Sequence, residues 1–443
     1  MMFYQIDKNM KNIFKKIIVF IITWQARLVL LKYKPKIIAI TGSVGKTSTK
    51  DAIFTVLSKC KTVRKSEKSF NSEIGLPLTI LGCPNGWDNF FIWLENILHG
   101  FHLILWKQTY PEYLVLEVGV GKPGDIKKNV APWLSPDVVV ITRFPEKPVH
   151  VEYFASVEKI IEEKSALAYS VKKGGLLILN HDDAKVYDLH KKIESRAVSF
   201  GLNENATYRA TYPSYMMKVN GSINIPEAIS FKLVYNGNTF PVLLPNIVGM
   251  HYIDVALISL AVANELGCDL LNAINSLKEY VIPPGRLSLI EGINESIIID
   301  DTYNSSPIAT DAAIEVLKCV IGGRKIAILG DMLELGKFTE EEHRLVGEKV
   351  SSVVDVLITV GLRSKLIREG AKSKGFPDKN IYSFDSYKDV TKFIVDFIKN
   401  GDIVLIKGSQ GVRLERVVEV IMAHPELKYK LLCRQDKEWK DKK

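Results

Sequence analysis

Short apolar runs alternate with amphipathic segments in the first part of the chain, a pattern that predicts an α/β domain. The runs, which are β-branched as strands buried in a parallel sheet are, span residues 36–40, 113–118, 137–142 and 175–180. Residues 156–171 instead carry apolar side chains at helical spacing. Between about 197 and 244, alternating apolar and polar positions predict strands over residues 207–212, 229–235 and 239–244, joined by turns such as Asn236-Gly237-Asn238. We therefore expect a mostly parallel sheet with a small antiparallel patch over residues 36–282.

Pro283-Pro284-Gly285 interrupts this pattern and predicts a hinge. Beyond it, apolar runs recur with helical segments between them, which predicts a second parallel, Rossmann-like α/β domain over residues 283–425. These runs span residues 296–300, 325–329, 356–360, 381–384 and 403–406. The charged segment 426–443 is expected to be a frayed tail.

Residues 1–35 are expected to form an amphipathic extension ahead of the first domain. Their apolar run 17–22 follows two lysines, but it is short and lacks a small-residue cleavage site, so neither export nor membrane spanning is expected. We interpret residues 8–33 as a helix whose basic side chains could contact the inner face of a membrane peripherally. Packing on its own domain is the alternative, and core packing is favoured for the aromatic stretch 87–106.

Composition narrows the class of protein only a little. The 443 residues carry a net charge of +9, yet the lysines are spread along the chain, which argues against a nucleic-acid partner. The five cysteines are far apart and never form a C-x-x-C pair, so neither a disulfide framework nor a zinc site is indicated and a reducing cytoplasm fits. A monomer is favoured, with the oligomeric state left open.

The run Ile40-Thr41-Gly42-Ser43-Val44-Gly45-Lys46-Thr47 places a glycine turn between a predicted strand and a predicted helix. Such a turn can bind nucleotide phosphates, because its backbone N–H groups and the helix dipole attract anions. Lys46 would add a mobile positive charge and Thr47 a Mg²⁺ ligand. The expected nucleotide-binding residues here are Gly42, Ser43, Gly45, Lys46, Thr47 and Ser48. The usual first glycine is replaced by Ile40, and a strand, turn and helix without a ligand is the alternative.

Three further residues are candidates for chemistry. Glu117 ends an apolar strand, where a carboxylate beside the phosphate loop could hold Mg²⁺ directly or through water; a solvated acid is the alternative. His150 and Lys164 lie fourteen residues apart. On their own they are typical of a loop histidine and a surface lysine paired with nearby acids.

A longer series of ordered motifs runs from about Lys36 to Val420. It comprises the phosphate loop, Asn71-Ser72-Glu73-Ile74-Gly75-Leu76-Pro77, Leu116-Glu117-Val118-Gly119, the His150 to Lys164 pair, Leu179-Asn180-His181-Asp182-Asp183, Gly285-Arg286, Ile299-Asp300-Asp301-Thr302-Tyr303-Asn304-Ser305-Ser306-Pro307, Leu329-Gly330-Asp331-Met332-Leu333-Glu334-Leu335-Gly336 and Lys407-Gly408-Ser409. This series resembles the Mur ligase family, and within it the type that adds D-alanyl-D-alanine to a muramoyl tripeptide. The resemblance implies an ATP-dependent, ADP-forming ligase of cell-wall synthesis that works through an acyl phosphate.

The resemblance also implies roles for particular residues. Those implied to be catalytic or to hold Mg²⁺ are Lys46, Thr47, Glu117, His150 and Lys164. Lys164 matches a lysine that some members carry as a carbamate, which is a hypothesis here. The residues implied to reach the nucleotide from the second domain are Arg286, Asp301 and Asn304, and those implied to contact the peptide acid or the incoming amine are Asn71, Tyr303, Ser306, Lys407 and Ser409.

Three departures from the family pattern bear on function. Val255 stands where an asparagine normally touches adenine, and a valine side chain cannot form hydrogen bonds; Arg143 replaces another asparagine. Only some 35 residues precede the phosphate loop, where the family has a domain for the uridine nucleotide. The acid could therefore be lipid-linked or held by a partner. The alternatives are a related ligase that extends a different acid, such as a polyglutamate, and a membrane-associated nucleotide-binding protein without ligase activity.

Overall fold

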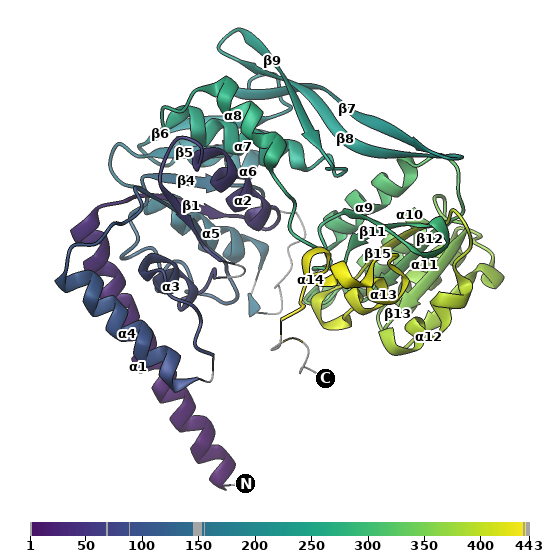
Figure 1. The fold of residues 1–443 in the computed structure, drawn as a ribbon, viewed down its shortest axis with the longest axis horizontal. Helices are drawn as coiled ribbons and strands as arrows, with labels where there is room; N and C mark the ends of the chain where they lie inside the picture. Colours follow the sequence, from purple (N-terminus) through teal and green to yellow (C-terminus); the bar gives the residue numbers. More distant parts are fainter. Residues whose placement is uncertain are drawn as a thin grey trace.

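Two α/β domains lie side by side in the protein (Figure 1). The structure, a computed structural model, describes residues 2–67, 70–87, 89–144, 153–154, 156–436 and 439, with side chains from residue 15 onward. His150 lies outside these residues, so its role at the site stays a prediction.

In the described part of the chain, nine strands form the sheet of the first domain. In spatial order they are β2 (Val63–Lys65), β3 (Tyr113–Glu117), β1 (Lys36–Thr41), β4 (Val138–Ile141), β5 (Leu176–Asn180), β6 (Arg196–Gly201), β7 (Tyr208–Asn220), β8 (Ile223–Tyr235) and β9 (Asn238–Pro245). All neighbours from β2 to β7 pair in parallel, and β7, β8 and β9 pair antiparallel. The predicted parallel sheet with an antiparallel patch is confirmed.

Helices cover both faces of this sheet, as a parallel sheet requires. The helices described here are α1 (Met2–Tyr33), α2 (Lys46–Leu57), α3 (Gly75–Leu81), α4 (Phe90–Leu105), α5 (Val157–Tyr169), α6 (Ala184–Tyr187), α7 (Tyr252–Glu265) and α8 (Leu270–Ser276). Successive side chains of β1 point to opposite faces: Ile38 and Ile40 pack in one core with α2 and α7, and Ile37 and Ala39 in another with α1 and α3.

The antiparallel strands are longer than the alternation predicts, because β7 and β8 continue past the sheet as an arm. The arm reaches the second domain at the upper right of Figure 1. Near its tip Asn224 exchanges two backbone hydrogen bonds with Ile321 (2.8 and 2.9 Å), and Ile223 and Ile225 are buried in the second domain's core. The two domains are thus joined at the arm as well as through the linker.

The second domain is the predicted Rossmann-like unit. Its strands, in spatial order, are β10 (Ser288–Glu291), β11 (Ile297–Asp301), β15 (Ile403–Lys407), β12 (Lys325–Gly330), β13 (Val356–Val360) and β14 (Ile381–Phe384). Only β10, a strand that the sequence pattern does not predict, pairs antiparallel among these. The helices described in this domain are α9 (Pro307–Cys319), α10 (Thr339–Val350), α11 (Lys365–Ser373), α12 (Tyr387–Phe397), α13 (Glu415–Ile421) and α14 (Lys428–Leu431).

The N-terminal segment forms the predicted helix. One side of α1 is buried in the first domain through Ile18, Ile22, Ala26 and Val29. Domain packing is therefore confirmed for that side. Among the helices that the structure describes, none combines the length and the apolar character needed to cross a membrane.

The expectation of a frayed tail is wrong for residues 428–434. Leu432 and Cys433 are buried, and the guanidinium of Arg434 donates to the backbone oxygens of Thr302 and Tyr303 (2.5 and 2.8 Å). The burial of Leu432 and Cys433 and the hydrogen bonds of Arg434 hold this segment in place. The charged composition of the tail gives no sign of either.

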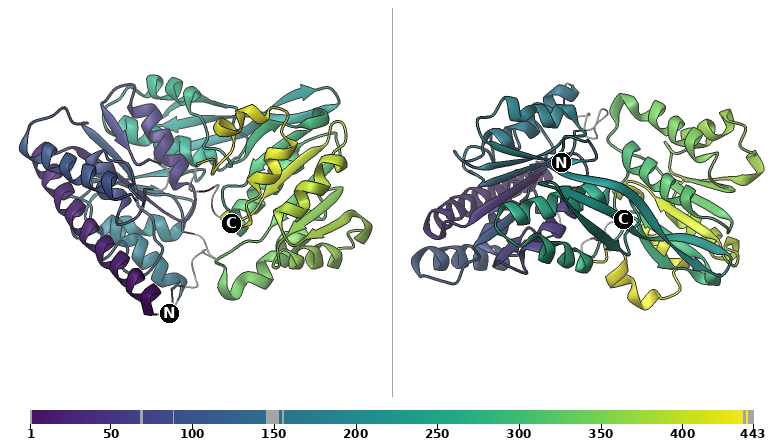
Figure 2. Two further views of the ribbon diagram at one scale, coloured as in Figure 1. Left: turned by 60° about the horizontal axis from the view of Figure 1, so that its bottom comes forward. Right: turned by 90° about the horizontal axis from the view of Figure 1, so that it is seen from above.

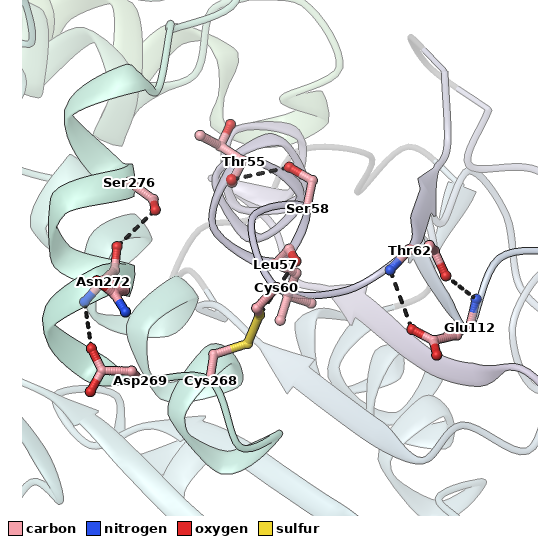
Figure 3. Close-up of a disulfide and its surroundings, with 10 residues drawn as sticks. All are labelled: Thr55, Leu57, Ser58, Cys60, Thr62, Glu112, Cys268, Asp269, Asn272 and Ser276. Atoms are coloured by element: carbon pink, nitrogen blue, oxygen red, sulfur yellow. Dashed lines mark hydrogen bonds between the residues drawn. A yellow bond between two sulfur atoms is a disulfide. The ribbon is translucent and has the colours of Figure 1, made fainter.

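The expectation of unpaired cysteines is also corrected. Cys60, just after α2, forms a disulfide with Cys268, which lies between α7 and α8 (Figure 3). The two residues are 208 positions apart in sequence, and it is the packing of α2 against α7 and α8 that brings them together. Within the described residues Cys83, Cys319 and Cys433 remain free thiols.

Candidate active site

The phosphate loop begins where β1 ends and leads directly into α2. Gly42 has a φ of 145°, and a Cβ on it would lie 2.0 Å from the Thr142 hydroxyl, so no other residue fits there. Gly45, at a φ of 81°, precedes the first helical residue. The loop is anchored to the end of β4, because Thr142 Oγ1 donates to the Val44 oxygen (2.7 Å) and Ser43 N to the Arg143 oxygen (2.9 Å). The predicted strand, turn and helix are confirmed.

The side chain of Lys46 folds back over the phosphate loop. Its Nζ donates to the Gly42 oxygen at 2.9 Å. Burial lowers the pKa of Lys46, while the carboxylate of Glu117 raises it and Arg286 lowers it further. The three charges are therefore close enough to influence one another, although Arg286 belongs to the other domain.

Lys164 is not the surface lysine that its neighbours in sequence suggest. Its side chain is buried and its Nζ donates to Ser43 Oγ at 2.6 Å, which places it at the phosphate loop. Burial lowers the pKa of Lys164 well below its ordinary value, and the nearby Lys46 adds to this shift. A buried lysine with a depressed pKa has the neutral amine that reaction with CO₂ requires.

Glu117 also lies at this site. It is 2% exposed, one carboxylate oxygen accepts a hydrogen bond from Asn71 Nδ2 (3.2 Å), and the other is buried without a partner in the described structure. Thr47 lines the same pocket as Glu117, and a carboxylate oxygen and a hydroxyl oxygen are donors that suit Mg²⁺. The residues present therefore fit the predicted metal. No group of three or more His, Cys, Asp or Glu that could hold a metal ion occurs in the described residues, which omit His150.

The second domain closes the site with the loop between β11 and α9. A single pocket is lined from the first domain by Ser43, Val44, Gly45, Lys46, Thr47, Asn71 and Glu117, and from the second by Arg286, Tyr303, Asn304, Ser305, Ser306 and Ala309. Arg286 stacks on the Tyr303 ring at 4.2 Å, and Ser306 Oγ accepts from the Ala309 N–H at the start of α9. Most of the residues predicted from sequence are thus brought together.

A second, more apolar pocket continues from the first. The two share Val44, Gly45, Arg286, Asn304 and Ala309. The apolar pocket adds Ser48, Arg143, His251, Asp254, Val255 and Ile258 from the first domain and Ile308, Ala312 and Asp301 from the second. The polar pocket with its phosphate loop suits the phosphates of a nucleoside triphosphate, and the apolar pocket that continues from it suits the nucleoside.

Two residues predicted to contact the incoming amine have partners inside the second domain. Lys407 is buried; its Nζ lies 2.5 Å from Asp301 Oδ2 and donates to the Asn304 oxygen at 3.0 Å. Burial lowers the pKa of Lys407 and the contact with Asp301 opposes that shift. Ser409 Oγ accepts from Leu333 N at 2.8 Å. This geometry favours a role for both in positioning the Asn304 loop.

Comparisons with known proteins agree with this architecture. The family model for the Mur ligase middle domain matches residues 40–263, and the model for the Mur ligase glutamate ligase domain matches residues 285–410. The chain belongs to the Mur ligase family. The boundary between the two matches falls close to the predicted hinge.

Similar Mur ligases are found among both sequences and solved structures. The chain is 30% identical over 402 residues to the UDP-N-acetylmuramoyl-tripeptide–D-alanyl-D-alanine ligase of Bacillus subtilis, covering 90% of this chain and 79% of that protein. It matches the structure of MurF from Thermotoga maritima in complex with ADP with a TM-score of 0.71 at 26% identity, covering 91% and 83% of the two chains. A pseudomurein peptide ligase type C from Methanothermus fervidus shares the fold, with a TM-score of 0.60 at 20% identity and coverages of 87% and 79%.

In this Mur ligase the apolar pocket contains a residue that the sequence analysis overlooks. Val255 lines the pocket, as its position predicts, and Asp254 lines it as well. Burial raises the pKa of Asp254 to about 6, and Arg143 opposes that rise. A carboxylate that faces a nucleotide base can accept a hydrogen bond from an exocyclic amino group.

Arg434 is a second overlooked residue of this Mur ligase. Besides holding the backbone of the Tyr303 loop, its guanidinium donates to Glu415 Oε2 at 2.9 Å, and both side chains are buried. The tail therefore supports the loop that closes the pocket. A single arginine within a lysine-rich tail gives no sequence signal of this role.

Proposed function

We propose that the chain is an ATP-dependent, ADP-forming ligase that joins D-alanyl-D-alanine to the peptide of a muramoyl precursor. The observation that carries this proposal is the pocket shared by Lys46, Glu117 and the Tyr303 loop, in a chain that covers 79% of the B. subtilis D-alanyl-D-alanine ligase. A carboxylate is a poor electrophile, so the terminal phosphoryl group of ATP first moves to it and ADP leaves. The amine then attacks the acyl phosphate, and the tetrahedral intermediate expels phosphate to leave an amide.

The residues of the pocket can each support the phosphoryl transfer. The N–H groups at the start of α2 bind phosphate oxygens, and Lys46 and Arg286 face the transferred group from opposite domains, where they offset the negative charge that develops. Asn71 Nδ2 donates to Glu117 and holds its carboxylate in place. Mg²⁺ held by Thr47, Glu117, His150 and a carbamate on Lys164 would add further positive charge at the phosphate oxygens.

We propose a monomer on the cytoplasmic side, with the N-terminal helix in peripheral contact with the inner membrane face. Support for the helix contact comes from the apolar side chains that α1 leaves exposed, among them Phe20 (73%) and Leu31 (70%).

The test is a phosphate- and ADP-release assay with UDP-linked muramoyl tripeptide and D-alanyl-D-alanine. We expect equal amounts of ADP and phosphate only when acid, amine and ATP are all present, and at least a 100-fold loss of rate in Glu117→Gln. Glu95→Gln, a change at an exposed glutamate of α4, is the matched control and should keep full activity.

Three results would contradict the proposal in different ways. AMP in place of ADP would exclude an acyl phosphate. ATP hydrolysis that does not depend on the amine would favour a nucleotide-binding protein without ligase activity. Turnover with a lipid-linked or polyglutamate acid but not with the muramoyl tripeptide would favour the related ligases.

A further inference from the structure

The outer surface of the first domain carries two parallel helices, α1 and α4, which lie side by side in all three views (Figures 1 and 2). They are closely joined. Gln25 Nε2 donates to the Ile97 oxygen (2.8 Å), and a Cβ on Gly100 would lie 2.4 Å from the Gln25 amide oxygen, so a glycine is needed for this approach. Lys32 Nζ caps the end of α4 through the Leu103, Ile104 and Trp106 oxygens (2.7–2.9 Å).

Each helix presents an apolar stripe to solvent. On α1 the exposed stripe residues are Ile17 (52%), Phe20 (73%), Trp24 (45%) and Leu31 (70%). On α4 they are Phe91 (78%), Leu94 (43%), Leu98 (60%), Phe101 (39%) and Leu105 (66%). Because a helix turns by about 100° per residue, these positions lie roughly opposite the buried positions Ile22 and Ala26 of α1 and Trp93 and Leu103 of α4.

The two stripes form one continuous surface. The rings of Trp24 and Phe101 meet edge to face with centroids 6.2 Å apart, across the line where the helices touch. Trp87 before α4 and Trp106 after it are also exposed, at 58% and 56%. A contiguous apolar surface of this kind is uncommon on a monomer and is typical of a binding face.

The charges around this surface indicate which kind of partner binds to it. Residues 8–33 contain six lysines and arginines and no acid, and Lys15, Lys16 and Lys107 are exposed at the ends of the surface. Glu95 is the one acid of α4. Two copies of this face would bring like charges together, whereas an anionic bilayer is attracted to them. Tryptophan and phenylalanine at the centre with lysines at the edges are typical of a helix lying in a membrane interface.

We propose that the paired stripes of α1 and α4 dock the enzyme on an anionic lipid bilayer. This inference rests on the peripheral membrane contact proposed above for α1. It extends that contact to the face formed by α1 and α4 and names anionic lipid as what this face binds. Vesicle binding is measured without ATP or peptide, so a failure here would leave the ligase test unaffected.

The experiment is flotation of the full chain with vesicles of phosphatidylglycerol and phosphatidylcholine, or of phosphatidylcholine alone. We expect binding to the anionic vesicles that falls at least ten-fold in the double variant Phe20→Glu with Leu98→Glu. The matched control is Leu362→Glu, at a leucine 76% exposed on the second domain, and it should bind as the wild type does. Lys15→Glu should weaken binding to anionic vesicles about five-fold or more and leave binding to neutral ones unchanged.

Three outcomes would overturn the proposal. One is no binding of the wild type to either vesicle; another is equal binding by wild type and the double variant, with unchanged circular dichroism. The third is a wild-type dimer in sedimentation that the double variant converts to a monomer while neither binds vesicles, which would assign the face to a second copy.

Discussion

The buried ion pair between Lys407 and Asp301 allows a sharp test of how the second domain holds its active-site loop. The side chains are 1% and 10% exposed, and their N and O atoms are 2.5 Å apart. Replacing Lys407 with methionine keeps most of the volume but leaves the Asp301 carboxylate buried without its cation. Breaking a buried pair in this way costs about 3–5 kcal/mol.

That loss is large enough to measure by thermal or urea unfolding. For a domain of this size about 1 kcal/mol shifts Tm by roughly 2–4 °C, so Lys407→Met should lower the Tm of the second domain by roughly 10 °C. Lys365→Met is the matched control: this lysine pairs with Asp385 at 3.0 Å, but the side chains are 49% and 81% exposed. The control should lose about 0–1 kcal/mol.

A double-mutant cycle separates the ion pair from packing. Asp301→Asn alone leaves Lys407 buried and unpaired, whereas the two changes together remove both charges. We therefore expect the double variant to be more stable than the sum of the single losses predicts, by about 2 kcal/mol or more. Equal losses for Lys407→Met and Lys365→Met, or strict additivity in the cycle, would refute the argument that burial makes this pair essential.

Three other predictions address the nucleotide site and the core. Labelled bicarbonate should give a carbamate NMR signal that strengthens as pH rises through the lowered pKa of Lys164, is absent from Lys164→Met and persists in Lys159→Met. ATP affinity should fall about five-fold as pH drops through about 6, where Asp254 gains a proton, and Asp254→Asn should abolish this step. Thiol titration of the unfolded protein should find three cysteines before reduction and five after it; five before reduction would exclude the Cys60–Cys268 bond.

The elements that the sequence predicts well are those whose signal is local. The phosphate loop is confirmed because its glycines, Lys46 and the flanking periodicities all lie within one strand, turn and helix. The apolar runs predicted as parallel strands are confirmed for the same reason, since burial on both faces makes each of them continuous.

Contacts between distant segments were harder to predict. Lys164 looks like a surface residue from its acidic neighbours, and only the packing of α5 directs it at Ser43, 121 positions away. The arm formed by β7 and β8 is longer than the alternation predicts, because the outer half of β7 is mostly exposed and only Ile223 and Ile225 of β8 pack on the second domain. Cys60 and Arg434 find their partners in the same way, through tertiary packing alone.

The arm also constrains how the active site can open. The pocket lies between the domains, which are connected at the linker near Gly285, whose oxygen accepts from Tyr303 N (3.0 Å), and at the arm, where Asn224 pairs with Ile321. A rotation about the line through these two connections would preserve both, whereas a motion that pulls the second domain away from the arm would expose Ile223 and Ile225 and break the backbone pairing. We therefore expect domain closure over ATP to follow this axis, a motion that would bring Arg286 and the Tyr303 loop toward Lys46.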